Sequence, residues 1–111
     1  MTYEEVKTMI AGFDLPYAYN EFPHDTQQAP PFICFLFDDN SDDMMADNSN
    51  YQAIRPLSIE LYTDEKDFSL ENTIETALKN AGLSFVRTEN WIASERMYQI
   101  NYDTEVIISN G

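Results

Sequence analysis

The chain has 111 residues, with 20 Asp and Glu against 6 Lys and Arg and a formal net charge of -14. This length predicts a single domain over residues 1–111 whose core needs no disulfide or structural metal, and 43% hydrophobic and 14% aromatic residues argue against disorder. The charge excludes a site for free nucleic acid, which needs a basic stripe, and an anionic membrane surface, which would repel the chain.

The N-terminal residues predict a helix followed by a strand. Thr2 and Glu5 form a capping-box pair ahead of apolar residues at helical spacing, so we expect a helix over about 2–12. Gly12 stands where a helix end favours a left-handed residue. The aromatic segment 15–22 is too short for a helix, and we expect a strand there.

The next strand is predicted over Phe32–Phe37, after a loop that holds His24 and two adjacent prolines. The run is apolar without alternation, which is typical of a strand covered on both faces. A domain of this size rarely covers both faces itself. We therefore expect a helix on one face and either a second layer or a partner subunit on the other.

A solvated loop or long hairpin tip is predicted for residues 38–50, which are rich in Asp, Asn and Ser. A strand is expected over about 51–63, in which Pro56 lacks an N–H and therefore marks an edge or a bulge. Ser69 is placed to cap a second helix, whose apolar stripe ends at Gly82 in a Schellman-type stop.

Two further strands complete the prediction. The first covers about 83–88, with an extension toward 92, and the second covers about 96–108, where apolar and polar residues alternate. The turn between them is assigned either to Glu89-Asn90 or to residues 93–95. The order α-β-β-β-α-β-β with short links predicts an α+β fold, a mostly antiparallel sheet of about five strands with both helices on one face.

Residues with catalytic potential are few. His24 is the single histidine, and no orienting partner for a general base can be named beside it. Cys34 is the single cysteine; its apolar strand predicts an inert packed thiol, and a lone cysteine fits a reducing compartment. No catalytic motif is present, so we expect no enzyme and no cofactor.

The acidic loop partly follows a calcium-binding pattern. Asp38, Asn40 and Asp42 match the first three alternate ligands of an EF-hand loop, but Asp43 replaces the required Gly and Ser49 the final Glu. We therefore expect a solvated loop rather than a specific metal site. A small metal-using enzyme has only this failed pattern in its favour.

The chain has seven Tyr and seven Phe, which either fill the core or anchor a protein–protein interface. The continuous apolar run favours an interface in part. The candidate interface residues are Phe32, Phe35, Phe37, Met44 and Met45.

Several stretches resemble the small tail-terminator and head–tail joining proteins of long-tailed bacteriophages and prophages, sometimes called minor capsid proteins. These stretches are residues 15–23, 30–35, 47–51, 57–68 and 97–106, so the resemblance spans nearly the whole chain. It implies a virion protein, assembled in the host cytoplasm, that forms a ring, usually a hexamer. Such a ring ends the tail tube and contacts the tube protein and the head connector, without an active site.

The charge fits such a ring, because carboxylates that face the lumen repel DNA phosphates and let the genome slide. We therefore expect the acidic loop to face the lumen or the tube end, through Asp38, Asp39, Asp42, Asp43 and Asp47. An alternative is an acidic DNA mimic that inhibits a host DNA-binding enzyme. Mimicry needs carboxylates at phosphate-like spacing, whereas here they crowd into one loop.

Overall fold

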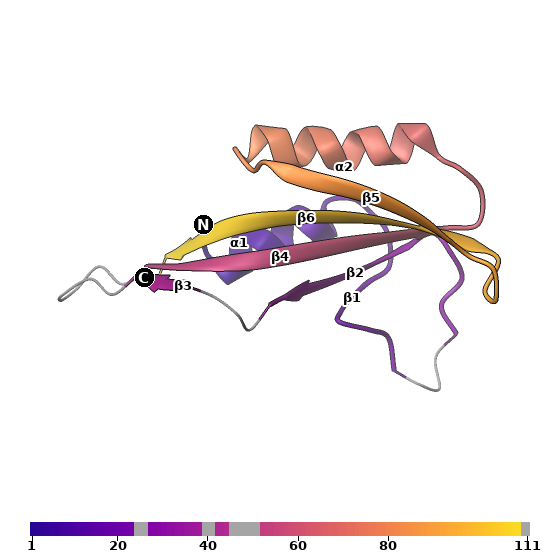
Figure 1. The fold of residues 1–111 in the computed structure, drawn as a ribbon, viewed down its shortest axis with the longest axis horizontal. Helices are drawn as coiled ribbons and strands as arrows, with labels where there is room; N and C mark the ends of the chain where they lie inside the picture. The colour runs from indigo at the N-terminus through magenta and orange to yellow at the C-terminus, as the bar shows by residue number, and fades with distance from the viewer. Residues whose placement is uncertain (24–26, 39–41, 45–51, 110–111) are drawn as a thin grey trace.

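The sheet of the molecule runs in the strand order β1-β2-β4-β6-β5, with the short β3 beside β4. The computed structural model describes residues 1–23, 27–38, 42–44 and 52–109. The elements are α1 (Tyr3–Ala11), β1 (Tyr17–Tyr19), β2 (Phe32–Phe37), β3 (Asp42–Met44), β4 (Gln52–Thr63), α2 (Phe68–Asn80), β5 (Phe85–Ile92) and β6 (Met97–Ser109) (Figure 1).

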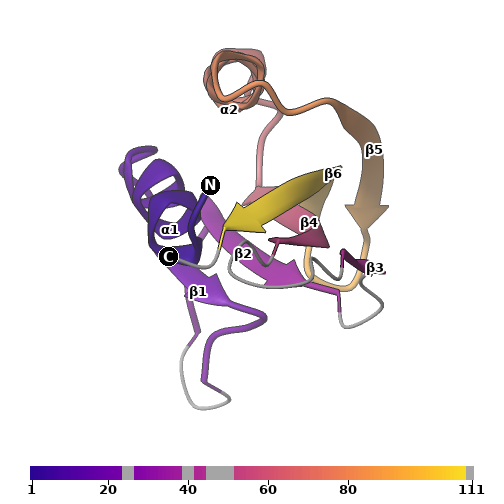
Figure 2. The same ribbon diagram turned by 90° about the vertical axis from the view of Figure 1, so that its left-hand side faces the viewer.

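The predicted fold class is confirmed. The strands pair in antiparallel fashion except for β1, which lies parallel to β2, and both helices lie on the same face of the sheet (Figure 2). The strand β3 is an addition, because it lies within the segment predicted to be a loop. No helix in the described ranges is both long and apolar enough to cross a membrane.

The core lies between the helices and one face of the sheet. Alternate residues of the two central strands face the helices, and these side chains are buried: Leu57, Ile59 and Leu61 of β4 with Ile100, Tyr102 and Val106 of β6. Val6 and Ile10 of α1 and Ile74 and Leu78 of α2 close the core from above. The period-2 alternation of β6 therefore separates a face that packs in the core from one that does not.

The start of α1 is as predicted, but its end is not. The Glu5 N–H donates to the Thr2 hydroxyl at 3.1 Å and the Thr2 N–H donates to the Glu5 carboxylate at 2.8 Å, which completes the capping box. Gly12, however, has a φ of -68°, so the left-handed conformation predicted for it is wrong. Tight-turn hydrogen bonds continue to Asp14, which takes the positive φ of 59° instead.

The second helix begins at a different cap from the one predicted. Asp67, not Ser69, is the N-cap, and its carboxylate accepts the Leu70 N–H at 3.0 Å. Ser69 lies in the first turn, where its carbonyl accepts the Thr73 hydroxyl. Both residue types favour the N-cap, so the local pattern permitted either.

The end of α2 is the predicted Schellman motif. The Leu83 N–H donates to the Leu78 carbonyl at 2.9 Å, and the Gly82 N–H donates to the Lys79 carbonyl at 3.0 Å. Gly82 has a φ of +76°, which disfavours any side chain with a Cβ. The chain can therefore leave the helix at once and enter β5.

On the side of β4 that pairs with β2 and β3, the ladder is interrupted at Pro56. The missing N–H of this proline predicted such a point. Pairing with β2 ends where Phe37 faces Leu57, and pairing with β3 begins where Asp42 faces Ile54. Arg55 and Pro56 of β4 lie between these two pairings. The Pro56 carbonyl still accepts the Asp38 N–H at 2.9 Å.

Both faces of β2 are covered within the subunit: one face packs in the core, and the other lies under aromatic side chains. Ile33 and Phe35 pack into the core, while Cys34, on the opposite face, is also buried. Over that face, the ring of Phe32 stacks on Tyr62 at 4.8 Å and meets Phe22 edge-on at 5.4 Å.

The last two strands follow the longer of the predicted alternatives. β5 extends to Ile92, so Glu89-Asn90 lies within the strand and the turn falls at residues 93–96. The Arg96 N–H donates to the Ala93 carbonyl at 3.3 Å, and Arg96 has a positive φ of 53°.

Replacing Gly82 by Ala will destabilise the protein by about 1–2 kcal/mol, the cost of a left-handed residue that carries a Cβ. No atom lies within 4 Å of the added Cβ, so the loss comes from the backbone alone. Chemical denaturation checks it. Gly82→Asn is the matched control and should lose clearly less, because Asn tolerates this conformation; equal losses would contradict the explanation.

Candidate functional site

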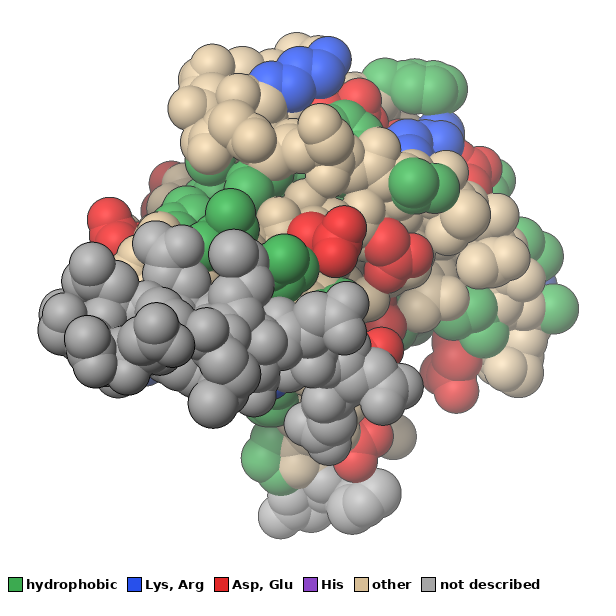
Figure 3. All heavy atoms as spheres, turned by 60° about the vertical axis from the view of Figure 1, so that its left-hand side comes forward, with side chains coloured by type: hydrophobic (Ala, Val, Ile, Leu, Met, Phe, Trp, Pro, Cys, Tyr) green, Lys and Arg blue, Asp and Glu red, His purple; other side chains and the backbone are tan. Residues whose placement is uncertain are grey.

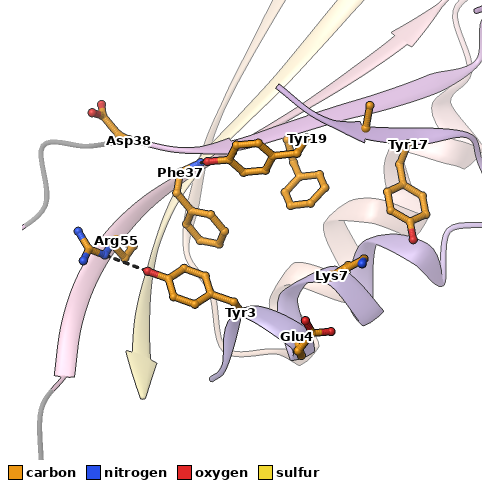
Figure 4. Close-up of a pocket in the computed structure, with 10 residues that line it drawn as sticks. Tyr3, Glu4, Lys7, Tyr17, Tyr19, Phe37, Asp38 and Arg55 are labelled. Atoms are coloured by element: carbon orange, nitrogen blue, oxygen red, sulfur yellow. Dashed lines mark hydrogen bonds between the residues drawn. The ribbon is translucent and has the colours of Figure 1, made fainter. Parts of the chain in front are cut away.

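A pocket with a volume of about 720 Å³ opens where α1 crosses the β1–β2 edge of the sheet (Figure 4). Its walls are mostly aromatic. Five rings from three elements line it: Tyr3 of α1, Tyr17 and Tyr19 of β1, and Phe35 and Phe37 of β2. Tyr3 and Tyr19 are about half exposed, at 48% and 55%, so the pocket offers accessible aromatic surface.

Hydrogen bonds and ring contacts hold these side chains in place. The Tyr19 hydroxyl accepts the Phe37 N–H at 3.0 Å, and the Tyr3 hydroxyl accepts the Arg55 Nε–H at 3.2 Å. The ring of Phe37 meets Tyr3 edge-on at 5.0 Å, and Phe35 meets Tyr19 edge-on at 5.3 Å. The pocket is therefore preformed, which lowers the entropic cost of filling it.

The charged residues that line the pocket balance one another. Glu4 and Asp38 contribute carboxylates, and Lys7 and Arg55 contribute cations. The whole chain carries -14, so this is an unusually neutral part of a strongly acidic molecule. An acidic partner would meet little repulsion here.

Across the molecule, an ion-pair network ties α2 to β5. Glu71, only 3% exposed, accepts hydrogen bonds from Lys66 and Arg87, and both cations also contact Glu89. Arg87 further approaches Glu75 at 3.6 Å. The buried carboxylate therefore has two cationic partners, as a buried charge requires.

The pKa values of this network reflect its pairing. Hydrogen bonds from Lys66 and Arg87 lower the pKa of Glu89. The hydrogen bond to Glu71 raises the pKa of Arg87. Partial burial opposes the charged form of Lys66, but hydrogen bonds to the two glutamates outweigh it and raise the pKa. The charged states are therefore the stable ones at neutral pH.

The face of the sheet away from the helices is acidic. The strand register places Glu60 of β4 and Asp103 and Glu105 of β6 on this face. The Ser58 hydroxyl donates to Asp103 at 2.6 Å, and the Asn101 amide donates to the same carboxylate at 2.8 Å. Figure 3 shows carboxylates in red at several places on one side of the molecule, with two groups of basic side chains in blue toward the top.

The structure does not bring the five candidate interface residues together. Phe35 is only 6% exposed and packs in the core, although its ring also forms part of the pocket wall. Phe37 lines the aromatic pocket, whereas Phe32 lies on the opposite face of β2. Met44 belongs to β3, and Met45 lies outside the described residues.

The acidic residues are likewise divided. Asp38 is exposed and lines the pocket. Asp42 and Asp43 pair with β4 as part of β3, so the predicted loop is a strand at these positions. Asp39 and Asp47 lie outside the described ranges, as does His24.

Cys34 behaves as the packed thiol that the sequence predicted. Burial is the main cause that raises its pKa to about 11, with Glu60 and Glu21 adding to the shift. The thiol is therefore protonated at neutral pH, and a thiolate nucleophile is disfavoured. Among the residues that the structure describes, no group of three or more His, Cys, Asp or Glu side chains could hold a metal ion.

Sequence reasoning missed the aromatic pocket. The signal was present in Tyr17 and Tyr19, two aromatic residues at strand spacing. Their parallel pairing with β2 and the position of α1 are contacts between distant segments, and no local pattern encodes them.

Comparison with known proteins gives a likeness of fold. No family model matches the chain, and no curated protein matches its sequence. Among solved structures, a chain of the virion of a native gene transfer agent particle is similar, with a TM-score of 0.58 and 15% sequence identity. The match covers 97% of this chain and 91% of that one, so the two share the whole fold.

Glu89→Gln will lower stability at pH 7 by less than about 1 kcal/mol, the range for partly exposed ion pairs. Because the pKa of Glu89 is lowered in the folded state, its contribution exists above the ordinary value of 4.5 and fades as pH falls through the lowered value. The difference from wild type should therefore vanish in acid. Thermal melts from pH 7 to pH 3 measure it.

The matched control is Glu65→Gln, which removes the same charge from an exposed turn outside the network. It should be neutral or slightly stabilising at pH 7, since it relieves repulsion in an acidic chain. A loss equal to that of Glu89→Gln would argue against the network.

Proposed function

We propose that the chain is a structural protein of the virion of a long-tailed phage or prophage. More specifically, it acts as a tail terminator or tail completion protein that forms a ring, usually of six copies, between the tail tube and the head connector. Its role is structural rather than catalytic. It is located in the host cytoplasm during assembly and in the virion afterwards.

The observation that carries this proposal is the likeness of fold to a chain from a gene transfer agent virion, which extends over nearly the full length of both chains. The likeness is independent of the short stretches that resemble tail terminators, because those are local sequence patterns. The resemblance of these stretches and the likeness of fold thus favour virion assembly on separate grounds.

The charge supports the same role. The carboxylates of Glu60, Asp103 and Glu105 share one face of the sheet, and Asp38 is exposed at the end of β2. In a ring, acidic faces of this kind would repel DNA phosphates and keep the genome from binding as it passes. Specific nucleic-acid binding and membrane binding are not part of the proposal.

The isolated chain should be a monomer at low salt and low concentration, and its self-association should strengthen as salt rises or when the tail tube is present. Each copy carries -14, so assembly works against repulsion that salt screens, over a Debye length of about 10 Å at 0.1 M. Sedimentation velocity at increasing ionic strength, with electron microscopy of the largest species, measures assembly and looks for rings.

Two outcomes would contradict the proposal. An oligomer that strengthens as salt falls would show that attraction between charges, and not apolar contact, drives assembly. A chain that forms no rings but captures a host nuclease or repressor, in competition with DNA, would favour the DNA mimic instead.

A further inference from the structure

A second apolar surface lies at the end of the molecule where α2 begins and β5 turns into β6, at the right of Figure 1. Phe68 is 73% exposed and Trp91 is 50% exposed. The Trp91 ring contacts Tyr98 at 4.8 Å, and the Lys66 ammonium lies 5.0 Å from the Phe68 ring and 6.0 Å from the Tyr98 ring. We call Phe68, Trp91 and Tyr98 the aromatic knob.

The fold itself does not require this exposure. Phe68 is the first residue of α2, where any residue suited to a first turn would serve. A phenylalanine at that position buries little of its ring within its own subunit and exposes most of it to solvent. Exposed aromatic residues beside cations are typical anchors of protein interfaces.

The knob and the aromatic pocket lie in different regions along the long axis of the molecule. The pocket is lined by α1, β1, the end of β2 and Arg55 near the start of β4. The start of α1, the end of β2 and the start of β4 lie toward the left of Figure 1. The molecule extends 50 Å along this axis. When the knob of one copy meets the pocket of the next, two unlike surfaces make a heterologous contact. Such contacts build a ring if the rotation between copies closes, and an open filament if it does not.

Charge favours the same pairing. Lys7 and Arg55 line the pocket, and Lys66 and Arg87 lie in the network beneath the knob, so four of the six cations of the chain lie at these two surfaces. Two copies of an acidic chain meet least repulsion where their cations are.

We propose that the aromatic knob of one copy inserts into the aromatic pocket of a second copy and that this contact joins neighbouring subunits. The inference rests on the proposed ring and specifies the surfaces that build it. The pocket volume of about 720 Å³ is in the range of sites that enclose groups larger than one aromatic side chain.

Two variants test the contact with matched chemistry. Tyr3 and Phe68 are the first residues of α1 and α2, so Tyr3→Glu and Phe68→Glu each place a carboxylate in a first turn, where the helix dipole favours it. Each variant should fold, which circular dichroism confirms. Each should weaken self-association at least about tenfold, as expected for an interface anchor, in sedimentation velocity at high salt.

The mixture of the two variants gives the decisive result. Tyr3→Glu keeps an intact knob and Phe68→Glu keeps an intact pocket, so an equimolar mixture should form a one-to-one dimer and no ring, while each variant alone stays monomeric. A mixture that remains monomeric would overturn the contact.

Val86→Glu is the control, because it adds the same charge at a side chain that is 65% exposed and outside both surfaces; it should assemble like wild type. Rings of wild type that persist in Phe68→Glu would overturn the contact but leave the proposed function standing. Wild-type protein that stays monomeric at all salt concentrations would overturn both.

Discussion

The pairing of β4 with β6 is the interaction on which the rest of the structure depends. The two strands face each other from Gln52 to Thr63 along the whole of β4. This register places one set of alternate side chains under the helices and the other set on the open face. A slip of β4 by one residue would turn Glu60 toward the core and expose Leu61, so the apolar core holds the register and the register places the acidic face.

The parts of the fold that the sequence could predict are those with local causes. The alternation of β6, the capping box at Thr2 and the Schellman stop at Gly82 each depend on residues a few positions apart. Pro56 likewise predicted the interruption in the ladder, because a residue without an N–H cannot donate a ladder hydrogen bond in any sheet.

The parts that it could not predict depend on distant contacts. A strand was predicted over residues 15–22, but its short extent, Tyr17–Tyr19, and its parallel pairing with β2 were not. The strand β3 forms because β4 offers an edge beyond Pro56. The pocket needs both α1 and β1 in place. The candidate interface set shows the same limit: an apolar run identifies a strand, but only the alternation of faces shows that Phe35 and Phe37 line the pocket while Phe32 lies on the opposite face.

The few cations of the chain explain how so acidic a molecule holds one buried carboxylate and still offers surfaces for contact. Lys66 and Arg87 compensate Glu71 beneath α2, and the charge that remains lies on exposed side chains, where water screens it. Folding thus tolerates the excess of carboxylates at little cost. Association does not tolerate this excess, because each new copy adds the same charge at close range. The surfaces that can meet are those where aromatic rings and cations coincide, and in the described chain the pocket and the aromatic knob combine both features.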